Sequence, residues 1–180
     1  MILTYTECIK KYGNDYQLKK AVGEEMLYRV ESGLYSTERL WAEIEVIMKK
    51  YPSAILTGEY AFYCHELTDV IPEKYDIATK AKAAKLQDPR ILQIYVRDDL
   101  LLLGVVKKEI QGVIVKIYDK ERMLIELLRN KNYMPYELYK EIIGNYRKII
   151  EELQIWRIQE YAEIFPKSKM IKKALEEEVF

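Results

Sequence analysis

Apolar and polar positions change period at two places along the chain, each where a strand pattern gives way to a helix pattern. At the first, the apolar run Ala54-Ile55-Leu56 is followed by Thr57-Gly58 and then by a helical pattern. The apolar residues on one face of this predicted helix are Tyr60, Ala61, Cys64 and Leu67. Thr57 stands where a hydroxyl can accept hydrogen bonds from the first turn, so we expect it to cap the helix.

The second change of period occurs at Asp119. Val113, Val115 and Ile117 alternate with polar residues and predict a strand with one buried face. From Asp119 onward the apolar residues recur with helical spacing, which predicts a helix that Asp119 caps. Glu121 and Glu126 are expected to lie on its polar face.

The N-terminal residues predict two short helices and a hairpin. The first helix runs from Thr4 or Thr6, as its cap, to Gly13, and the second runs over residues 15–25 with Asn14 or Asp15 as its cap. Residues 26–36 form a hairpin that turns at Glu31-Ser32-Gly33. Two helices joined by a tight turn and followed by a hairpin are typical of a winged helix-turn-helix.

The rest of the chain is predicted to mix strands and helices. Residues 37–51 read as an amphipathic helix capped by Thr37, with Leu40 and Trp41 on its inner face. Strands follow at 75–79 and 91–96, and residues 105–117 form a hairpin that turns near Gln111-Gly112. After Asp119 the chain is helical, with further helices over 134–150, over 151–165 and from Ser168.

These elements predict an α+β protein with a small N-terminal winged helix-turn-helix, a small central sheet and a helical C-terminal part. We place the N-terminal module and its connecting helix in residues 1–50 and the α+β domain in residues 51–180. No Gly/Ser/Pro-rich linker separates the two parts. The sequence also contains no internal repeat.

The composition is that of an ordinary globular protein. The 180 residues are 49% apolar, and 29 basic residues balance 29 acidic ones, so net charge draws this protein toward neither nucleic acid nor an acidic membrane. The two cysteines, Cys8 and Cys64, lack the spacing of a metal site and suit a reducing compartment. The N-terminus does not resemble a signal peptide, and no apolar run is long enough to span a membrane. We therefore expect a cytoplasmic protein.

The sequence gives no sign of enzyme chemistry. His65 is the only histidine, and it is adjacent to Cys64, so the two side chains would diverge on a helix rather than form a catalytic pair. Asp98-Asp99 lacks further spaced oxygen ligands and is better explained as a helix start than as a metal site. No phosphate-binding, zinc-protease or serine-hydrolase motif occurs. We expect no catalytic residues, no metal and no cofactor.

Three blocks of the sequence resemble the AbiEi family of bacterial antitoxins, the regulator-like halves of type IV toxin-antitoxin systems. They are SAILTGEYAFYCHELT at 53–68, VIVKIYDKERMLIELL at 113–128 and the wing-like MLYRVESGLYS at 26–36. The match is imperfect because Lys120 and Glu126 stand where the family often has Pro and Asp. The residues that carry the family signature, for which we expect a structural role, are Thr57, Gly58, Ala61, His65, Leu67, Asp119, Glu121 and Arg122.

The resemblance implies a non-catalytic transcriptional regulator of an antiviral defence system. It would bind its own promoter DNA through the winged helix and counteract a nucleotidyltransferase-type toxin, with or without direct contact. In such a module the second helix enters the major groove, and the wing holds the backbone. The candidate nucleic-acid-binding residues are Gln17, Lys19 and Lys20 on the helix, Arg29 and Tyr35 in the wing, and the locally basic Lys80, Lys82 and Lys85.

Two features leave other interpretations open. A winged helix normally has a helix before these two, whereas only three residues precede Thr4, and Glu24 and Glu25 would repel phosphate. The alternative is a protein-interaction module whose reduced winged helix no longer binds DNA, and 16 tyrosines against 3 phenylalanines suit such a partner surface. A nuclease-like enzyme is disfavoured because no carboxylate and lysine set is recognisable. The operator, the toxin and the oligomeric state do not follow from the sequence.

Overall fold

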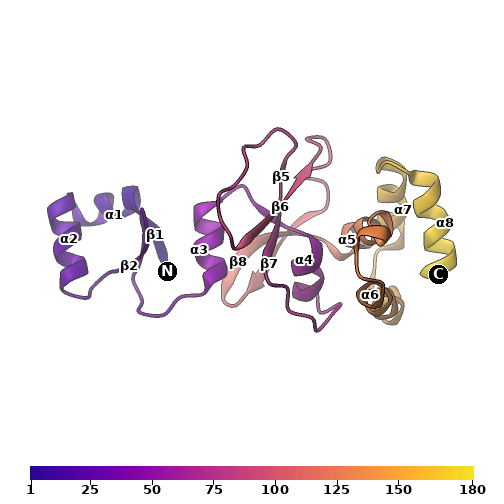
Figure 1. Cartoon of the computed structure of the whole chain (residues 1–180), viewed down its shortest axis with the longest axis horizontal. Helices are drawn as coiled ribbons and strands as arrows, with labels where there is room; N and C mark the ends of the chain where they lie inside the picture. Colours follow the sequence, from indigo (N-terminus) through magenta and orange to yellow (C-terminus); the bar gives the residue numbers. More distant parts are fainter. The chain divides into compact units, whose positions relative to one another are not determined.

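A computed structural model describes all 180 residues of the chain (Figure 1). The fold is mixed α+β, as the sequence predicts, and no helix is both long and apolar enough to cross a membrane. The chain divides into two compact units, residues 1–54 with 111–113 and residues 55–110 with 114–180.

The first unit contains a three-stranded antiparallel sheet and three helices. Its elements are β1 (Ile2–Thr4), α1 (Tyr5–Tyr12), α2 (Asp15–Gly23), β2 (Tyr28–Glu31), β3 (Leu34–Ser36) and α3 (Glu43–Lys50). The strand order is β1-β3-β2, so the strand that precedes the two helices pairs with the second strand of the hairpin. This arrangement is the predicted winged helix-turn-helix.

The predicted capping residues shape the two N-terminal helices. Thr4 and Glu7 form a capping box at the start of α1, and Gly13 ends that helix with a φ of 95°. Asn14 caps α2, because its Oδ1 accepts a hydrogen bond from the Gln17 amide at 2.9 Å. The helices and the sheet then bury one cluster of apolar side chains: Leu3, Cys8, Leu18, Ala21 and Leu27.

The helix predicted over residues 37–51 is shorter than expected. The amide of Thr37 donates to the carbonyl oxygen of Met1 at 3.1 Å, which continues the pairing of β3 with β1. Residues 37–42 are not helical, and Ala42 rather than Thr37 stands at the start of the helix. Only α3 forms, and Leu40 is 85% exposed rather than buried. Val46 of α3 packs with Ile2 and Leu34, so this helix covers part of the small sheet.

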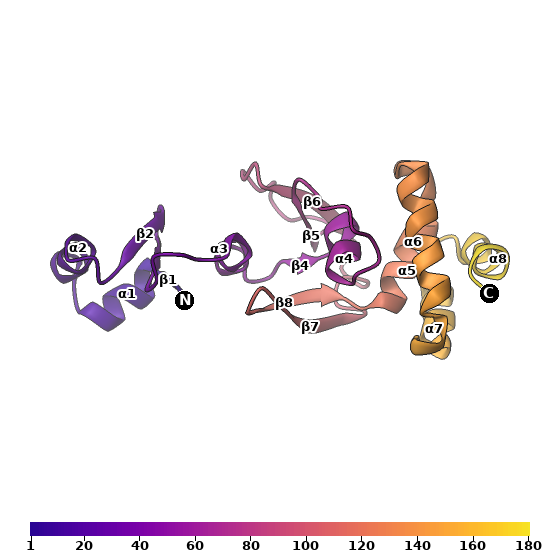
Figure 2. The same ribbon diagram turned by 90° about the horizontal axis from the view of Figure 1, so that it is seen from below.

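The second unit is built on a five-stranded mixed sheet (Figure 2). Its elements are β4 (Ile55–Leu56), α4 (Gly58–Cys64), β5 (Tyr75–Lys80), β6 (Ile91–Val96), β7 (Val105–Ile110) and β8 (Val113–Tyr118), followed by α5 (Lys120–Arg129), the 3-10 turn η1 (Lys131–Tyr133), α6 (Tyr136–Lys148), the 3-10 turn η2 (Ile150–Glu152), α7 (Ile155–Ile164) and α8 (Ser168–Glu178). The strand order is β6-β5-β4-β8-β7.

The order of this sheet places both changes of period at its centre. Strand β4 is parallel to β8 and antiparallel to β5, so the two strands that lead into α4 and α5 lie side by side. Helix α4 packs on β5, and α5 packs against α4, α7 and α8 (Figures 1 and 2). The predicted turn at Gln111-Gly112 is confirmed, because both residues have positive φ and join β7 to β8.

Candidate functional site

The exposed face of α2 carries three of the predicted DNA-binding residues. Leu18 and Ala21 turn inward and are 1% exposed, which leaves Gln17, Lys19 and Lys20 at the surface. These three side chains lie outside the apolar stripe of α2, which consists of Leu18, Ala21 and Val22. The helix therefore offers one amide and two ammonium groups to solvent.

The two wing residues are neighbours across the hairpin. Arg29 of β2 and Tyr35 of β3 are paired in the sheet register, so their side chains project on the same face. Tyr35 packs against the apolar cluster of the first unit and is half-buried, whereas Arg29 is exposed. That cluster includes Leu18 and Ala21 of α2, so the wing lies beside this helix. The structure thus brings the helix and wing candidates together.

Both lysines of α2 form ion pairs along their own helix. Lys19 Nζ lies 2.7 Å from Asp15 Oδ2, and this hydrogen bond is the main cause of the raised pKa of Lys19. Lys20 Nζ lies 3.8 Å from Glu24 Oε1. Both pairs are exposed, so water and dissolved salt screen them and they hold the lysines only weakly. A phosphate group can therefore replace either carboxylate at little cost.

The third basic group belongs to the other unit. Lys80 is the last residue of β5, and Lys82 and Lys85 lie in the loop that leads to β6. All three side chains are exposed and make no ion pair. The structure brings these lysines near one another, but it defines no surface that they share with α2 and the wing.

The signature residues around α4 are structural. Ala61 and Leu67 are core residues, and the Thr57 hydroxyl lies 3.8 Å from Met123 Sδ. Thr57 makes no side-chain hydrogen bond to the helix, so the predicted cap is wrong. Instead, Asp76 of β5 occupies this end of α4, and its Oδ2 accepts the Tyr60 amide at 3.1 Å. Gly58 has a φ of 56° and passes so close to Asp76 that an added Cβ would lie 2.6 Å from Oδ2.

His65 is held as a neutral structural side chain. It is 6% exposed, and its Nε2 lies 2.7 Å from the Tyr118 carbonyl oxygen. Because a carbonyl oxygen only accepts, Nε2 carries the proton. Burial lowers the pKa of His65 to about 4, so the ring is uncharged at neutral pH. This contact joins the end of α4 to the strand that leads into α5.

Asp119, Glu121 and Arg122 fix the start of α5. Asp119 is the predicted cap: its Oδ1 accepts the Arg122 amide at 2.7 Å, and its Oδ2 accepts the Tyr161 hydroxyl at 2.9 Å. Glu121 does not lie on a polar face as predicted, because it is 7% exposed and accepts the Gln154 amide at 2.9 Å. These carboxylates attach α7 to α5.

The guanidinium of Arg122 is completely buried. Its Nη1 donates to the carbonyl oxygens of Leu100 and Leu103, and its Cζ lies 3.3 Å from the centre of the Tyr118 ring. Desolvation lowers the pKa of Arg122, but carbonyl acceptors and the aromatic face compensate for part of that cost. Arg122 therefore connects the turn at 100–103 to α5 and contacts no open site.

No group of three or more His, Cys, Asp or Glu side chains is arranged to hold a metal ion. The residue that sequence reasoning missed is Asp76, whose carboxylate is 4% exposed. The available signal was a single acidic residue within an otherwise apolar strand, where a charge is costly unless it has a partner.

No model of a known protein family matches this sequence, and no curated protein matches it either.

Proposed function

We propose that this protein is an antitoxin-like transcriptional regulator of the AbiEi type, whose N-terminal winged helix binds promoter DNA. One observation carries the proposal: the β1-β3-β2 sheet supports two short helices and leaves Gln17, Lys19 and Lys20 exposed on the second. No catalytic group is assigned a role. Its effect on a cognate nucleotidyltransferase-type toxin follows from the sequence resemblance and needs no direct contact.

In this proposal each exposed residue has a distinct role. Lys19 and Lys20 neutralise phosphates, which supplies affinity without sequence preference. Gln17 can form a bidentate contact with adenine in the major groove. Arg29, on the wing next to Tyr35, holds the adjacent backbone. Helix α3 covers part of the small sheet, because Val46 packs on Ile2 of β1 and Leu34 of β3.

The test is a fluorescence titration of the full chain against the DNA upstream of its own gene, with random DNA as competitor. We expect preferential, salt-sensitive binding that Lys19→Glu/Lys20→Glu abolishes. A matched control is Lys140→Glu/Lys169→Glu, which makes the same charge change at two exposed lysines of the second unit that form no ion pair. Equal loss in both double variants would contradict a recognition helix at α2.

A second candidate function is a protein-interaction module, and two exposed tyrosines favour it. Tyr5 of α1 and Tyr16 of α2 are 43% and 72% exposed, and tyrosine is enriched at protein–protein interfaces. In this case the protein would not bind DNA at low salt. Instead, Tyr16→Ala would weaken its binding to a partner protein encoded beside it, measured by calorimetry.

A further inference from the structure

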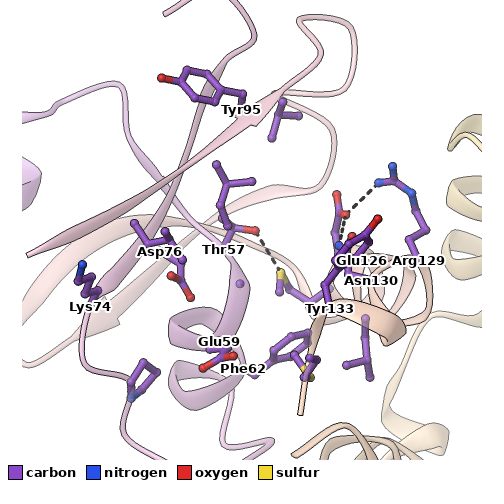
Figure 3. A pocket seen from close by; sticks show the side chains of 18 of the residues that line it. Thr57, Glu59, Phe62, Lys74, Asp76, Tyr95, Glu126, Arg129, Asn130 and Tyr133 are labelled. Atoms are coloured by element: carbon purple, nitrogen blue, oxygen red, sulfur yellow. Dashed lines mark hydrogen bonds and ion pairs between the residues drawn. The ribbon is translucent and has the colours of Figure 1, made fainter. Parts of the chain in front are cut away.

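A cavity of about 700 Å³ lies within the second unit (Figure 3). Thr57, Glu59 and Phe62 line it from the α4 side, and Asp76 and Tyr95 line it from the sheet. The end of α5 and the turn that follows close the opposite side, where Glu126, Arg129, Asn130 and Tyr133 are drawn in Figure 3. A volume of this size is typical of sites for small molecules.

The walls of the cavity are mainly apolar and aromatic. Phe62 and Met123 are almost completely buried, whereas Leu92 and Tyr133 are 52% and 86% exposed. Apolar side chains that remain open to solvent beside a deep hollow lose contact with water when a ligand enters. The body of a suitable ligand is therefore apolar, and the rings of Phe62, Tyr95 and Tyr133 favour an aromatic one.

Asp76 is the buried polar group on this wall. The residue is 4% exposed, the backbone amide of Tyr60 donates to Oδ2 at 3.1 Å, and the backbone amide of Glu59 also donates to the carboxylate. No lysine or arginine forms an ion pair with it. A buried carboxylate without a cation is costly to the folded state, and a cationic ligand would supply the missing charge.

The other charged residues of the cavity leave an excess of negative charge at its wall. Arg129 Nη1 lies 2.9 Å from Glu126 Oε2, and Arg97 Nη2 lies 2.6 Å from Asp99 Oδ2, so both guanidinium groups have acidic partners. The groups without an ion pair are the carboxylates of Glu59, Glu73 and Asp76 and the single ammonium of Lys74. An anionic ligand would face this excess of negative charge.

We propose that this cavity binds a small organic cation with an aromatic body, whose amine or amidine group is recognised by Asp76. The inference goes beyond DNA binding and concerns residues of the second unit only. The cation gives Asp76 the ionic partner that the protein lacks, and the ring buries apolar surface against Phe62 and its neighbours.

The first experiment compares three probes of nearly equal shape on the full chain: benzamidine, neutral benzamide and anionic benzoate. Binding is followed through the backbone amide resonances of residues 57–62 and 74–76 in NMR titrations. We expect benzamidine to bind in the millimolar range, as suits a fragment, and benzamide about tenfold more weakly. Benzoate should cause no saturable shift, and equal binding of benzoate and benzamidine would overturn the proposal.

Variants then test the role of Asp76. Asp76→Asn keeps an oxygen for the Tyr60 amide, and we expect it to weaken benzamidine binding about tenfold or more. Glu137→Gln removes an exposed carboxylate of α6 that is not part of the cavity, so it should leave binding unchanged. Leu92→Trp places a larger side chain at a half-exposed position of the cavity wall. We expect it to block benzamidine binding while the Asp76 carboxylate stays unchanged. Unchanged benzamidine binding in Leu92→Trp would contradict the site even if Asp76→Asn failed to fold.

Discussion

At the scale of single residues, Asp76 is a carboxylate whose negative charge is unfavourable in its buried surroundings. Burial raises its pKa from 3.8 to about 6, although the amides of Tyr60 and Glu59 favour the ionised form. The folded pKa lies above the unfolded one. The folded state therefore holds a proton between about pH 4 and pH 6 that the unfolded state has released, and stability falls as the pH rises through this window.

We predict that Asp76→Asn changes the pH dependence of unfolding. Two pKa units correspond to about 2–3 kcal/mol of stability that the wild type has at pH 4 and has lost at pH 7. The variant has no charge to bury, so we expect it to be about 1–2 kcal/mol more stable than the wild type at pH 7 and no more stable at pH 4. Denaturant unfolding at both pH values measures the difference.

Comparison with the wild type at each pH is necessary because His65 acts in the opposite direction. Its folded pKa of about 4 lies below the usual 6.5, so the unfolded state takes up a proton first and stability falls as the pH falls through that range. The two effects partly cancel in the wild type. A stability difference between Asp76→Asn and wild type that is the same at pH 4 and pH 7 would contradict the assigned role of Asp76.

At the scale of secondary structure, the first residue of α4, Gly58, is the glycine at which an added side chain would make the closest contact. We predict that Gly58→Ala destabilises the protein by about 3 kcal/mol, for two reasons. Alanine is strained in the left-handed backbone conformation of residue 58, and its Cβ would displace the Asp76 carboxylate from the start of α4. Gly112→Ala is the control: its φ is 78°, but an added Cβ meets no atom within 4 Å. We expect it to cost about 1 kcal/mol. Equal costs in thermal unfolding would argue against the close contact at Gly58.

Elements whose signals are local were predictable from the sequence. Gly13, Asn14 and Asp119 mark helix ends and caps where the structure has them, and Gln111-Gly112 forms the expected hairpin turn. These residues act on their immediate neighbours, so a short window of sequence contains both partners.

Elements that depend on distant partners were not predictable. Thr37 extends the pairing of β3 with the residue Met1 instead of starting a helix, and Glu121 is buried where it accepts the amide of Gln154. Likewise, the side chain that accepts a hydrogen bond from the first turn of α4 is the carboxylate of Asp76 and not the hydroxyl of Thr57. Each of these partners is brought close only by the folded sheet and helices. The cavity around Asp76 arises in the same way, since segments from five parts of the chain line it.

At the scale of the whole molecule, the absence of net charge limits how DNA binding can depend on salt. With 29 basic and 29 acidic residues, attraction comes only from a local surface, which we assign to Lys19, Lys20 and Arg29. Three phosphate contacts predict a slope of about −2.7 for the logarithm of affinity against the logarithm of salt concentration.

Replacement of one wing charge tests this estimate. Arg29→Gln should reduce the magnitude of the slope by about 0.9 and weaken binding to all sequences equally. The slope is measured by titration at four or more salt concentrations. A much steeper slope in the wild type would show that further cations, such as Lys80, Lys82 and Lys85, also contact the DNA.

The carboxylate that Asp76 supplies to α4 also bears on how the chain folds during synthesis. The ribosome completes α4 before it reaches residue 76, so the nascent helix, which spans only Gly58–Cys64, has no side-chain acceptor for its first amides. So short a helix is unstable in isolation. It gains its cap only when β5 pairs with β4, so we expect the three segments to fold as one cooperative step rather than in the order of translation.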